Sequence, residues 1–418
     1  MTSFASDVAA THALLQSVVE PTPLQRNQYL SDLHNADVWL KREDLSPVRS
    51  YKVRGAYSFL TKALADKPHQ DLFVCSSAGN HAQGFAYACR AYHKTGIVFM
   101  PVTTPQQKIM KTRAFGAPFV DIRLFGDGFD AANQQALEHC RQNDGMMVPP
   151  FDHPVIIEGQ ATVAKEILEQ LPGGTHPDSI ILAVGGGGLS AGVTRYCADM
   201  GYRGSFVFVE PDGAPSLHTS LAQSQRVTLD AIDNFVDGAA VARIGENNFA
   251  HLEHFTSDDV VLAPTDGVCA TMIEMLNVEG IVLEPAGALT IDALKRLPKN
   301  QIAGKTIVCI ASGGNFDFER LPEVKERALR FEGLKKYFVI GLPQRPGALK
   351  DFLSLFGPDD DIARFEYLKK SARNFGSVLL GIETKAPQNF VDLCTRFDQA
   401  DIRWQDITND ELVSSLIV

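Results

Sequence analysis

Ile180-Ile-Leu-Ala-Val184 runs directly into Gly185-Gly186-Gly187-Gly188-Leu189-Ser190, so a short apolar run is followed by four consecutive glycines. Such a run predicts a strand buried on both faces, as in a parallel sheet covered by helices. Because four glycines are entropically costly, we expect something to approach the backbone closely there. A phosphate resting on backbone N–H groups at the start of the next helix would explain them. The apolar flanks argue against a flexible linker.

The same alternation of short apolar runs and helical patterns extends over residues 72–314, which predicts an α/β fold with parallel sheets. The other expected strands are Leu72–Cys75, Ile97–Met100, Phe206–Val209 and Thr306–Ile310. The glycine run is not the dinucleotide fingerprint, which requires G-x-G-x-x-G in the first βα unit and an acidic residue about 20 positions further on. A phosphate monoester therefore fits better than a dinucleotide.

A lysine is the first candidate for covalent chemistry. Ser50-Tyr51-Lys52-Val53-Arg54-Gly55-Ala56 places Lys52 between a hydroxyl residue and an Arg-Gly pair, just before a helical pattern. An isolated lysine is usually a solvated residue on a helix. A lysine desolvated beside a cation can instead have a lowered pKa and act as a Schiff-base nucleophile.

A second candidate segment is Cys75-Ser76-Ser77-Ala78-Gly79-Asn80-His81-Ala82-Gln83-Gly84, which follows a predicted strand and opens a helix. Its small residues let several backbone N–H groups converge on an anion, and Asn80 can donate to a ring hydroxyl or a carboxylate. This suits a substrate carboxylate. An ordinary capped strand-to-helix turn is the alternative, and His81 is then a structural residue.

A third segment, Thr306-Ile-Val-Cys-Ile310-Ala311-Ser312-Gly313-Gly314-Asn315, is again a strand ending in small residues. It is preceded along the chain by Glu284-Pro285-Ala286-Gly287-Ala288. Open parallel sheets bind ligands at the carboxyl ends of their strands, so we expect these loops to share one cleft with Lys52, Asn80 and the glycine run. Taken alone, Ser312 would be a simple turn residue.

Composition limits the possible partners and compartments. The net charge of −11 argues against a nucleic-acid partner. The seven cysteines show no C-x-x-C spacing, so they predict neither a zinc cluster nor a disulfide framework and favour the cytoplasm. Met1–Leu15 lacks a signal-peptide pattern and no later window is apolar enough for a bilayer, so we expect no membrane association.

The length of 418 residues predicts two or three domains, because a single core stops growing well below this size. Residues 319–336 carry alternating charges and no apolar run, which is typical of an exposed connector. We therefore predict a catalytic domain over residues 1–325, with two α/β subdomains, and a second domain over residues 326–418. The sequence pattern of the second domain predicts the order β-α-β-β-α, which fits a ferredoxin-like module.

Together these segments resemble the fold-type II pyridoxal 5′-phosphate (PLP) enzymes related to tryptophan synthase β, and most closely the threonine dehydratases. The catalytic resemblance covers residues 14–320. It implies that Lys52 binds the cofactor covalently and acts as the catalytic residue. It further implies that Asn80 contacts the ring 3′-oxygen and that Ser312 faces the pyridine nitrogen. The residues implied for the cofactor phosphate are Gly185, Gly186, Gly187, Gly188 and Leu189; those implied for the substrate carboxylate are Ser77, Ala78, Gly79, Asn80 and His81.

The resemblance implies dehydration and deamination of L-threonine to 2-oxobutyrate and ammonia, with Lys52 as general base for the Cα proton. A neutral Ser312 opposite the pyridine nitrogen, rather than an aspartate, favours early loss of the β-substituent. Related racemases carry Ser where this chain has Ala78, so racemisation is not expected. The loop from Glu210 to Ser216 resembles a cation-binding loop, but Ser216 replaces an acidic ligand and no divalent metal is expected; a monovalent ion stays open.

The C-terminal residues Gly341–Leu349, Ile362–Tyr367 and Gly376–Glu383 resemble the ACT-like regulatory domain of biosynthetic threonine dehydratases, in a single copy. This implies inhibition by isoleucine, with valine as a candidate antagonist, and a homotetramer or homodimer. Three alternatives stay open: a domain that only holds an oligomer together, a catabolic serine/threonine dehydratase, and a non-catalytic amino-acid sensor.

Overall fold

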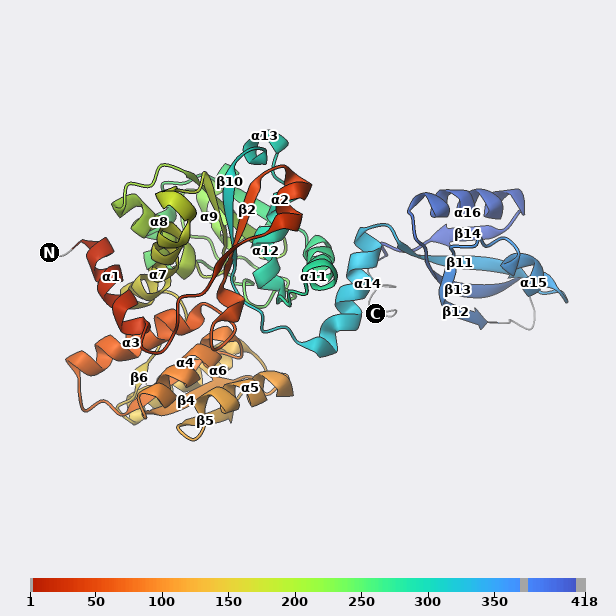
Figure 1. The fold of residues 1–418 in the computed structure, drawn as a ribbon. Helices are drawn as coiled ribbons and strands as arrows, with labels where there is room; N and C mark the ends of the chain where they lie inside the picture. Colours follow the sequence, from red (N-terminus) through yellow and green to blue (C-terminus); the bar gives the residue numbers. More distant parts are fainter. Residues whose placement is uncertain (1–2, 369–374, 411–418) are drawn as a thin grey trace. The chain divides into compact units, whose positions relative to one another are not determined.

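A computed structural model describes residues 3–368 and 375–410 of the chain (Figure 1). The chain forms two compact units, one of Met1–Val268 and Met275–Asp317, the other of Cys269–Glu274 and Phe318–Val418. Residues 325 and 326, where the sequence predicts the domain boundary, lie within helix α14 (Leu321–Phe331). The boundary itself stays a prediction.

The first unit contains two sheets. The larger has the strand order β1-β2-β10-β7-β8-β9, in which β1 is antiparallel to β2 and all other neighbours are parallel. The smaller has the order β5-β4-β3-β6 and is entirely parallel. The strands are β1 (Leu24–Arg26), β2 (Asp37–Arg42), β3 (Leu72–Ser76), β4 (Thr95–Met100), β5 (Val120–Leu124), β6 (Met146–Met147), β7 (Ser179–Ala183), β8 (Ser205–Pro211), β9 (Val260–Ala263) and β10 (Thr306–Ala311).

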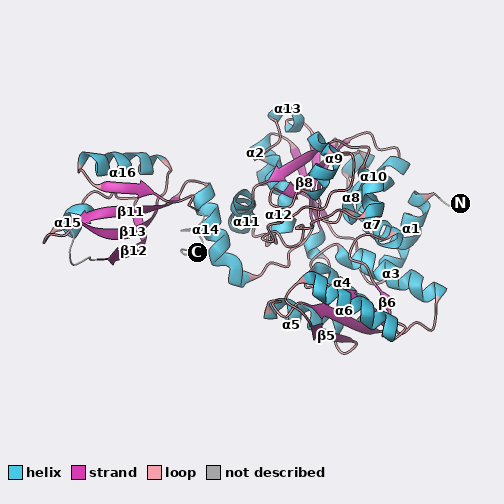
Figure 2. Cartoon of the chain, turned by 180° about the vertical axis from the view of Figure 1, so that it is seen from behind, coloured by secondary structure: helices cyan, strands magenta, loops and turns pink. Residues whose placement is uncertain are grey.

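Helices cover both sheets, as parallel strands require (Figure 2). The α-helices of this part of the chain are α1 (Phe4–Leu15), α2 (Gln28–His34), α3 (Lys52–Asp66), α4 (Asn80–Ala91), α5 (Gln106–Gly116), α6 (Phe129–Gln142), α7 (Pro154–Gln170), α8 (Gly188–Asp199), α9 (Ser216–Ala222), α10 (Glu246–Leu252), α11 (Thr265–Glu279), α12 (Pro285–Leu294) and α13 (Lys299–Ile302). Short 3-10 helices lie at Glu43–Leu45, Pro172–Gly174 and Ser257–Asp259. Every strand expected from the sequence of residues 72–314 is formed, and the α/β prediction is confirmed.

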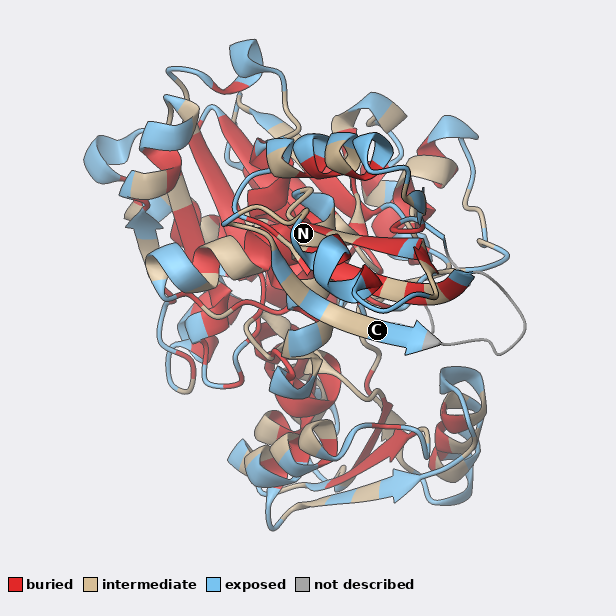
Figure 3. Ribbon diagram, turned by 90° about the vertical axis from the view of Figure 1, so that its right-hand side faces the viewer, coloured by how far each residue is buried: buried red, intermediate tan, exposed pale blue. Residues whose placement is uncertain are grey.

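Each sheet of the first unit has an apolar core of its own, visible as the buried strands in Figure 3. Ile180, Leu182 and Val308 belong to the core of the larger sheet. Phe73 and Val98 belong to the core of the smaller one. All five side chains are fully buried, which explains why these strands read as nearly continuous apolar runs.

A buried ionic network joins helices α3 and α7 to the segment after β2. Arg54 donates to Glu43 at 2.9 Å and to Glu166 at 2.6 and 2.8 Å. Lys41 donates to Glu166 at 2.6 Å, and His12 lies 3.2 Å from the same carboxylate. The four acidic and basic side chains from positions 41, 43, 54 and 166 are at most 3% exposed. Charges this deeply buried are tolerated because they are paired.

The second unit has one antiparallel sheet with the order β12-β13-β11-β14. Its elements are a 3-10 helix (Phe318–Arg320), α14, β11 (Lys335–Pro343), α15 (Ala348–Leu353), β12 (Asp361–Leu368), β13 (Phe375–Glu383), α16 (Gln388–Gln399) and β14 (Arg403–Asp406). Phe338, Phe352 and Phe397 are fully buried at its core. The predicted β-α-β-β-α order is present, and β14 extends it to the complete ferredoxin-like order.

Candidate active site

The segments singled out in the sequence follow the carboxyl ends of β3, β7 and β10, where open parallel sheets bind ligands. Contacts connect them in two groups. Lys52 and Gly186 both lie against Phe151, while Asn80 and the loop after Ser312 meet at Glu284. The predicted residues of these segments therefore converge, although they come from different sheets.

Lys52 begins helix α3 and is half-buried. Its Nζ donates to the Pro150 carbonyl at 3.0 Å and lies 5.8 Å from the centroid of the Phe151 ring. Burial lowers the pKa of Lys52 to about 8, although the negative charge of Glu284 acts in the opposite direction. A much larger fraction of this amine is neutral near pH 7 than for an ordinary lysine, which makes it a competent nucleophile and base.

The glycine run is held closely by the rest of the chain. A Cβ on Gly186 would lie 2.3 Å from the Phe151 ring, and one on Gly185 would lie 3.0 Å from Ala239. Gly187 has a φ of +88°, a left-handed conformation that favours glycine. The sequence alone suggested a ligand as the reason for these glycines. In the structure, packing against Phe151 already accounts for two of them, Gly186 and Gly188, where a Cβ would lie 2.3 and 2.9 Å from that residue.

The start of helix α8 nevertheless has free capacity for an anion. The helix begins at Gly188, and no side chain caps it. The Ser190 hydroxyl in its first turn is buried and has no hydrogen-bond partner in the described part of the chain. The first N–H groups of a helix also lack partners within the helix, so they bind anions well. This orphaned hydroxyl and uncapped helix start fit a phosphate. The sequence analysis quoted Ser190 but gave it no role.

The segment before helix α4 is arranged around Asn80. Gly79 precedes the helix, and its N–H bonds to the Ser77 hydroxyl at 3.2 Å. Asn80 Nδ2 donates to Glu284 Oε1 at 2.6 Å, and Asn80 Oδ1 accepts from Asn315 Nδ2 at 2.7 Å. The orientation of the Asn80 amide is thereby fixed. Ala78 is half-buried and packs against the core of the smaller sheet.

His81 is a buried member of this segment. Its Nε2 donates to the Val148 carbonyl at 3.0 Å. Burial lowers the pKa of His81 to about 3, and the charge of Lys52 acts in the same direction. The ring is therefore neutral at physiological pH, which fits the structural alternative for His81 better than an acid-base role.

Ser312 follows strand β10 and is buried. Its hydroxyl donates to the Ala286 carbonyl at 3.2 Å, and its own carbonyl accepts from the N–H of Tyr51 at 3.3 Å. Ser312 is thus directly bonded to the residue before Lys52, which places the third predicted segment beside the first.

Glu284 is the residue that the sequence analysis missed. It was quoted in Glu284-Pro285-Ala286 without a role. It stands at the N-cap of helix α12, but its side chain makes no capping bond and points to Asn80 instead. A glutamate at a position that usually holds Ser, Thr, Asp or Asn was the available signal.

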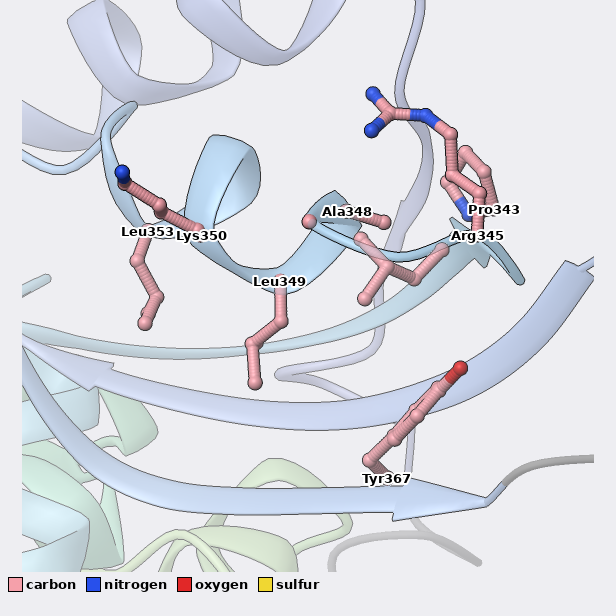
Figure 4. A pocket seen from close by; sticks show the side chains of 9 residues that line it. Pro343, Arg345, Ala348, Leu349, Lys350, Leu353 and Tyr367 are labelled. Atoms are coloured by element: carbon pink, nitrogen blue, oxygen red, sulfur yellow. The ribbon is translucent and has the colours of Figure 1, made fainter.

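The second unit contains a pocket of about 500 Å³. Figure 4 shows Leu349 and Leu353 of α15 on one side of it and Tyr367 of β12 on the other. Arg345 stands at its edge and pairs with Asp351 at 2.8 Å. The lining residues are Leu342, Pro343, Arg345, Gly347, Ala348, Leu349, Lys350, Leu353 and Tyr367.

Residues 15–313 match the family of pyridoxal-phosphate dependent enzymes, and the fold and site described above are those of this class. Residues 326–417 match the C-terminal regulatory domain of threonine dehydratase. The biosynthetic L-threonine dehydratase IlvA of Bacillus subtilis (strain 168) is 44% identical over 412 residues, which cover 98% of this chain and 96% of that protein. The chain belongs to the family of biosynthetic threonine dehydratases.

Two further comparisons agree. The biosynthetic L-threonine dehydratase IlvA of Halalkalibacterium halodurans is 41% identical and covers 99% of this chain and 98% of its own length. The processed form of threonine deaminase isoform 2 from Solanum lycopersicum superimposes with a TM-score of 0.72 at 36% identity, covering 78% of this chain and 92% of that one. The resemblance inferred from the sequence, its fold class and its cofactor are thereby confirmed.

Over the described residues, no helix is both long and apolar enough to cross a membrane. Within those same residues, His, Cys, Asp and Glu side chains form no group of three or more that could hold a metal ion.

Proposed function

We propose that this chain converts L-threonine to 2-oxobutyrate and ammonia with PLP bound at the loops after β3, β7 and β10. The observation that carries the proposal is the position of Lys52. A lysine with a pKa of about 8 shares Phe151 with the glycine run that leads into the uncapped start of helix α8. An amine that reacts with an aldehyde and a cradle for a phosphate are the two features that PLP requires.

The residues that would hold the cofactor follow from the site. Lys52 supplies the amine, the backbone of Gly185–Gly188 and Leu189 with the Ser190 hydroxyl receives the phosphate, Asn80 donates to the ring oxygen, and Ser312 faces the ring nitrogen. When bound, PLP withdraws electrons from Cα of the attached amino acid and so acidifies its proton.

The chain itself binds the substrate and moves the proton. The segment Ser77–His81 at the start of α4 receives the substrate carboxylate, because that helix also begins without a side-chain cap. Lys52 removes the Cα proton, since a base is most effective when its pKa lies near the working pH. Loss of the β-hydroxyl as water and hydrolysis then give the 2-oxo acid and ammonia.

Release of 2-oxobutyrate from L-threonine by the purified chain tests this proposal. Lys52→Ala should abolish both the release and the visible absorption band of the lysine-bound cofactor. Lys94→Ala removes a lysine that pairs with Asp71 outside the site and should leave both unchanged. Full activity in Lys52→Ala would refute the assignment of Lys52, and a band without turnover on threonine or serine would point to another substrate.

We also propose that the second unit, as a regulatory domain over residues 326–418, binds isoleucine in the pocket of α15 and β12. Leu342, Leu349 and Leu353 offer an apolar wall for a branched side chain, and Arg345 and Lys350 offer positive charge for a carboxylate. Valine shares this chemistry and is the candidate antagonist. The proposal further includes a cytoplasmic location and assembly of the chain as a homodimer or homotetramer.

Inhibition of turnover by isoleucine tests the regulatory part. Leu349→Glu should abolish inhibition and leave turnover without isoleucine unchanged. Val391→Glu, at an exposed apolar residue of α16 outside the pocket, should keep inhibition. Inhibition that survives in Leu349→Glu would place the effector elsewhere.

A further inference from the structure

Glu284 is a buried carboxylate whose role the proposed function leaves open. The residue is 6% exposed. Within the described residues it forms no ion pair, in contrast to Glu43 and Glu166. Burying an ionisable carboxylate without a paired cation is costly, so such groups concentrate at functional sites.

The Glu284 carboxylate accepts the last of a series of hydrogen bonds that runs through two side-chain amides. Asn315 Nδ2 donates to the Val48 carbonyl at 2.8 Å and to Asn80 Oδ1 at 2.7 Å. Asn80 Nδ2 then donates to Glu284 Oε1 at 2.6 Å. Because the oxygen of Asn80 is already occupied by Asn315, the amide presents its N–H groups toward Glu284. One N–H bonds to Glu284 and the second remains for the cofactor ring oxygen.

The backbone holds this carboxylate in place. The N–H of Glu284 bonds to the Gly313 carbonyl at 3.2 Å. A Cβ on Gly313 would lie 2.0 Å from Glu284 Oε1, so position 313 must be glycine for the carboxylate to occupy this place. The loop after β10 thus has a glycine where it contacts the Glu284 carboxylate.

Charged groups from several elements act on Glu284. Burial, together with the charge of Asp237, raises the pKa of Glu284 to about 7, although the Asn80 bond, Lys108 and Lys111 act in the opposite direction. Glu284 in turn raises the pKa of Lys52 and of Tyr51, on the segment that begins α3. Lys52 is the cation that takes part in the proposed reaction, and the negative charge of Glu284 favours its protonated form.

We propose that Glu284 is a positioning residue of the cofactor site, which orients the Asn80 amide toward the cofactor ring oxygen. The proposal rests on the proposed roles of Lys52 and Asn80. The same side chain also carries a negative charge, which acts on Lys52, and the substitutions below separate this charge from the hydrogen bond to Asn80.

Two substitutions separate these effects. Glu284→Gln keeps an oxygen that can accept from Asn80 but removes the charge. Glu284→Asp keeps the charge but withdraws the carboxylate from Asn80 by one methylene. Glu158→Gln is the matched control, because Glu158 is also a buried carboxylate, and it pairs with Lys62 instead of bonding to Asn80.

The first measurement is the pH at which the Lys52 nitrogen loses its proton. It is followed in the full-length protein by pH-dependent labelling of Lys52 after removal of the cofactor, and in the holoenzyme by the absorption band of the lysine-bound cofactor. Glu284→Gln should lower both midpoints by about one pH unit. Glu284→Asp and Glu158→Gln should leave both midpoints within a few tenths of a pH unit of those of the unsubstituted protein.

The second measurement is the affinity for PLP. Glu284→Asp should weaken binding by about tenfold, because Asn80 loses the acceptor that orients it. Glu284→Gln should weaken it much less. Midpoints that are the same in Glu284→Gln and in the unsubstituted protein would overturn the proposed charge effect, and equal PLP affinity in Glu284→Asp would overturn the orienting role. If the unsubstituted protein binds no PLP, the proposed function has failed instead.

Discussion

Lys52 and Arg54 lie two residues apart in the first turn of α3, yet their surroundings shift the pKa values of the two side chains in opposite directions. Burial would lower the pKa of Arg54, but Glu43 and Glu166 more than offset it and raise the pKa above its ordinary value. Burial of Lys52 is opposed by the charge of Glu284, which forms no ion pair with it in the described part of the chain, and the pKa of Lys52 falls to about 8. Within one helix turn, the Arg54 guanidinium is therefore held in its charged form, whereas the Lys52 amine is partly neutral near pH 7 and can react.

The difference teaches how the chain keeps a reactive lysine in a stable fold. The paired network of Arg54 ties together α3, α7 and the segment after β2, so the start of α3 is held firmly. Lys52 lies on that fixed helix start, and its side chain is held by a hydrogen bond to the Pro150 carbonyl instead of by an ion pair. We expect substitutions in the network to affect stability and substitutions around Lys52 to affect chemistry.

The largest expected effect is that of Arg54→Met. It leaves Glu43 and Glu166 buried without their main cation, and breaking a buried pair in this way costs about 3–5 kcal/mol of the free energy of unfolding. Denaturant unfolding measures it. Arg26→Met breaks the pair with Asp37, whose side chains are 41% and 40% exposed, and should cost less than about 1 kcal/mol. Equal losses in the two variants would contradict the comparison.

A smaller effect is expected from acid. Burial would raise the pKa of Glu166, but Arg54, His12 and Lys41 bring it below its ordinary value of 4.5. The stabilisation that the Glu166 ion pairs give is therefore complete above pH 4.5. It is lost as the pH falls toward the lower pKa that Glu166 has in the folded protein. Below pH 4.5, the unfolding free energy of the unsubstituted protein should fall more steeply than that of Glu166→Gln, by about 1.4 kcal/mol per pH unit. Parallel slopes in unfolding experiments between pH 5 and 3 would argue against this role.

A still smaller change in stability should follow from Lys52→Met. Removing a partly buried amine that has no ion pair in the described chain should change the unfolding free energy of the cofactor-free protein by less than about 1 kcal/mol, while activity is lost. The measurement is thermal unfolding alongside 2-oxobutyrate release. A loss of stability as large as that of Arg54→Met would show that Lys52 belongs to the structural network after all.

The smallest effect on stability should be that of Ser190→Ala. The Ser190 hydroxyl is buried without a partner among the described residues, so its removal should leave the cofactor-free protein equally stable or stabilised by up to about 1 kcal/mol. Affinity for PLP should nevertheless fall by about tenfold, because the phosphate loses a donor. Titration of the cofactor-free protein with PLP checks this, and an unchanged affinity would remove Ser190 from the phosphate site.

The sequence predicts the buried strands well and the contacts between them poorly. Strands such as Ser179–Ala183 can be predicted because both of their faces are buried, which makes the run nearly continuously apolar. Strand β14 has only Trp404 as a large apolar residue, and that residue is half-buried, so no pattern indicates it. Isoleucine as effector and the domain boundary stay predictions.

The candidate site was predictable where loops follow strands and not where distant residues meet. Asn80 and Ser312 stand out because each sits in a run of small residues after a predicted strand, and Lys52 because it precedes an Arg-Gly pair at the start of a helical pattern. The contact of Asn80 with Glu284 joins residues 204 positions apart, and the ring of Phe151 against Gly186 is equally invisible to a local pattern. Periodicity reports which face of an element is buried, and it carries no information on which side chain lies opposite.

The order of strands in the two sheets has a consequence for the growing chain. The β5-β4-β3-β6 sheet uses one continuous stretch, from Leu72 to Met147, so it can form as soon as that stretch leaves the ribosome. Strand β2 must wait for β10, whose residues Thr306–Ala311 pair with Asp37–Arg42. At ordinary rates of translation that wait lasts roughly ten seconds or more, during which the edge of β2 is unpaired. Pulse proteolysis of ribosome-bound chains should therefore find the smaller sheet protected before the larger one.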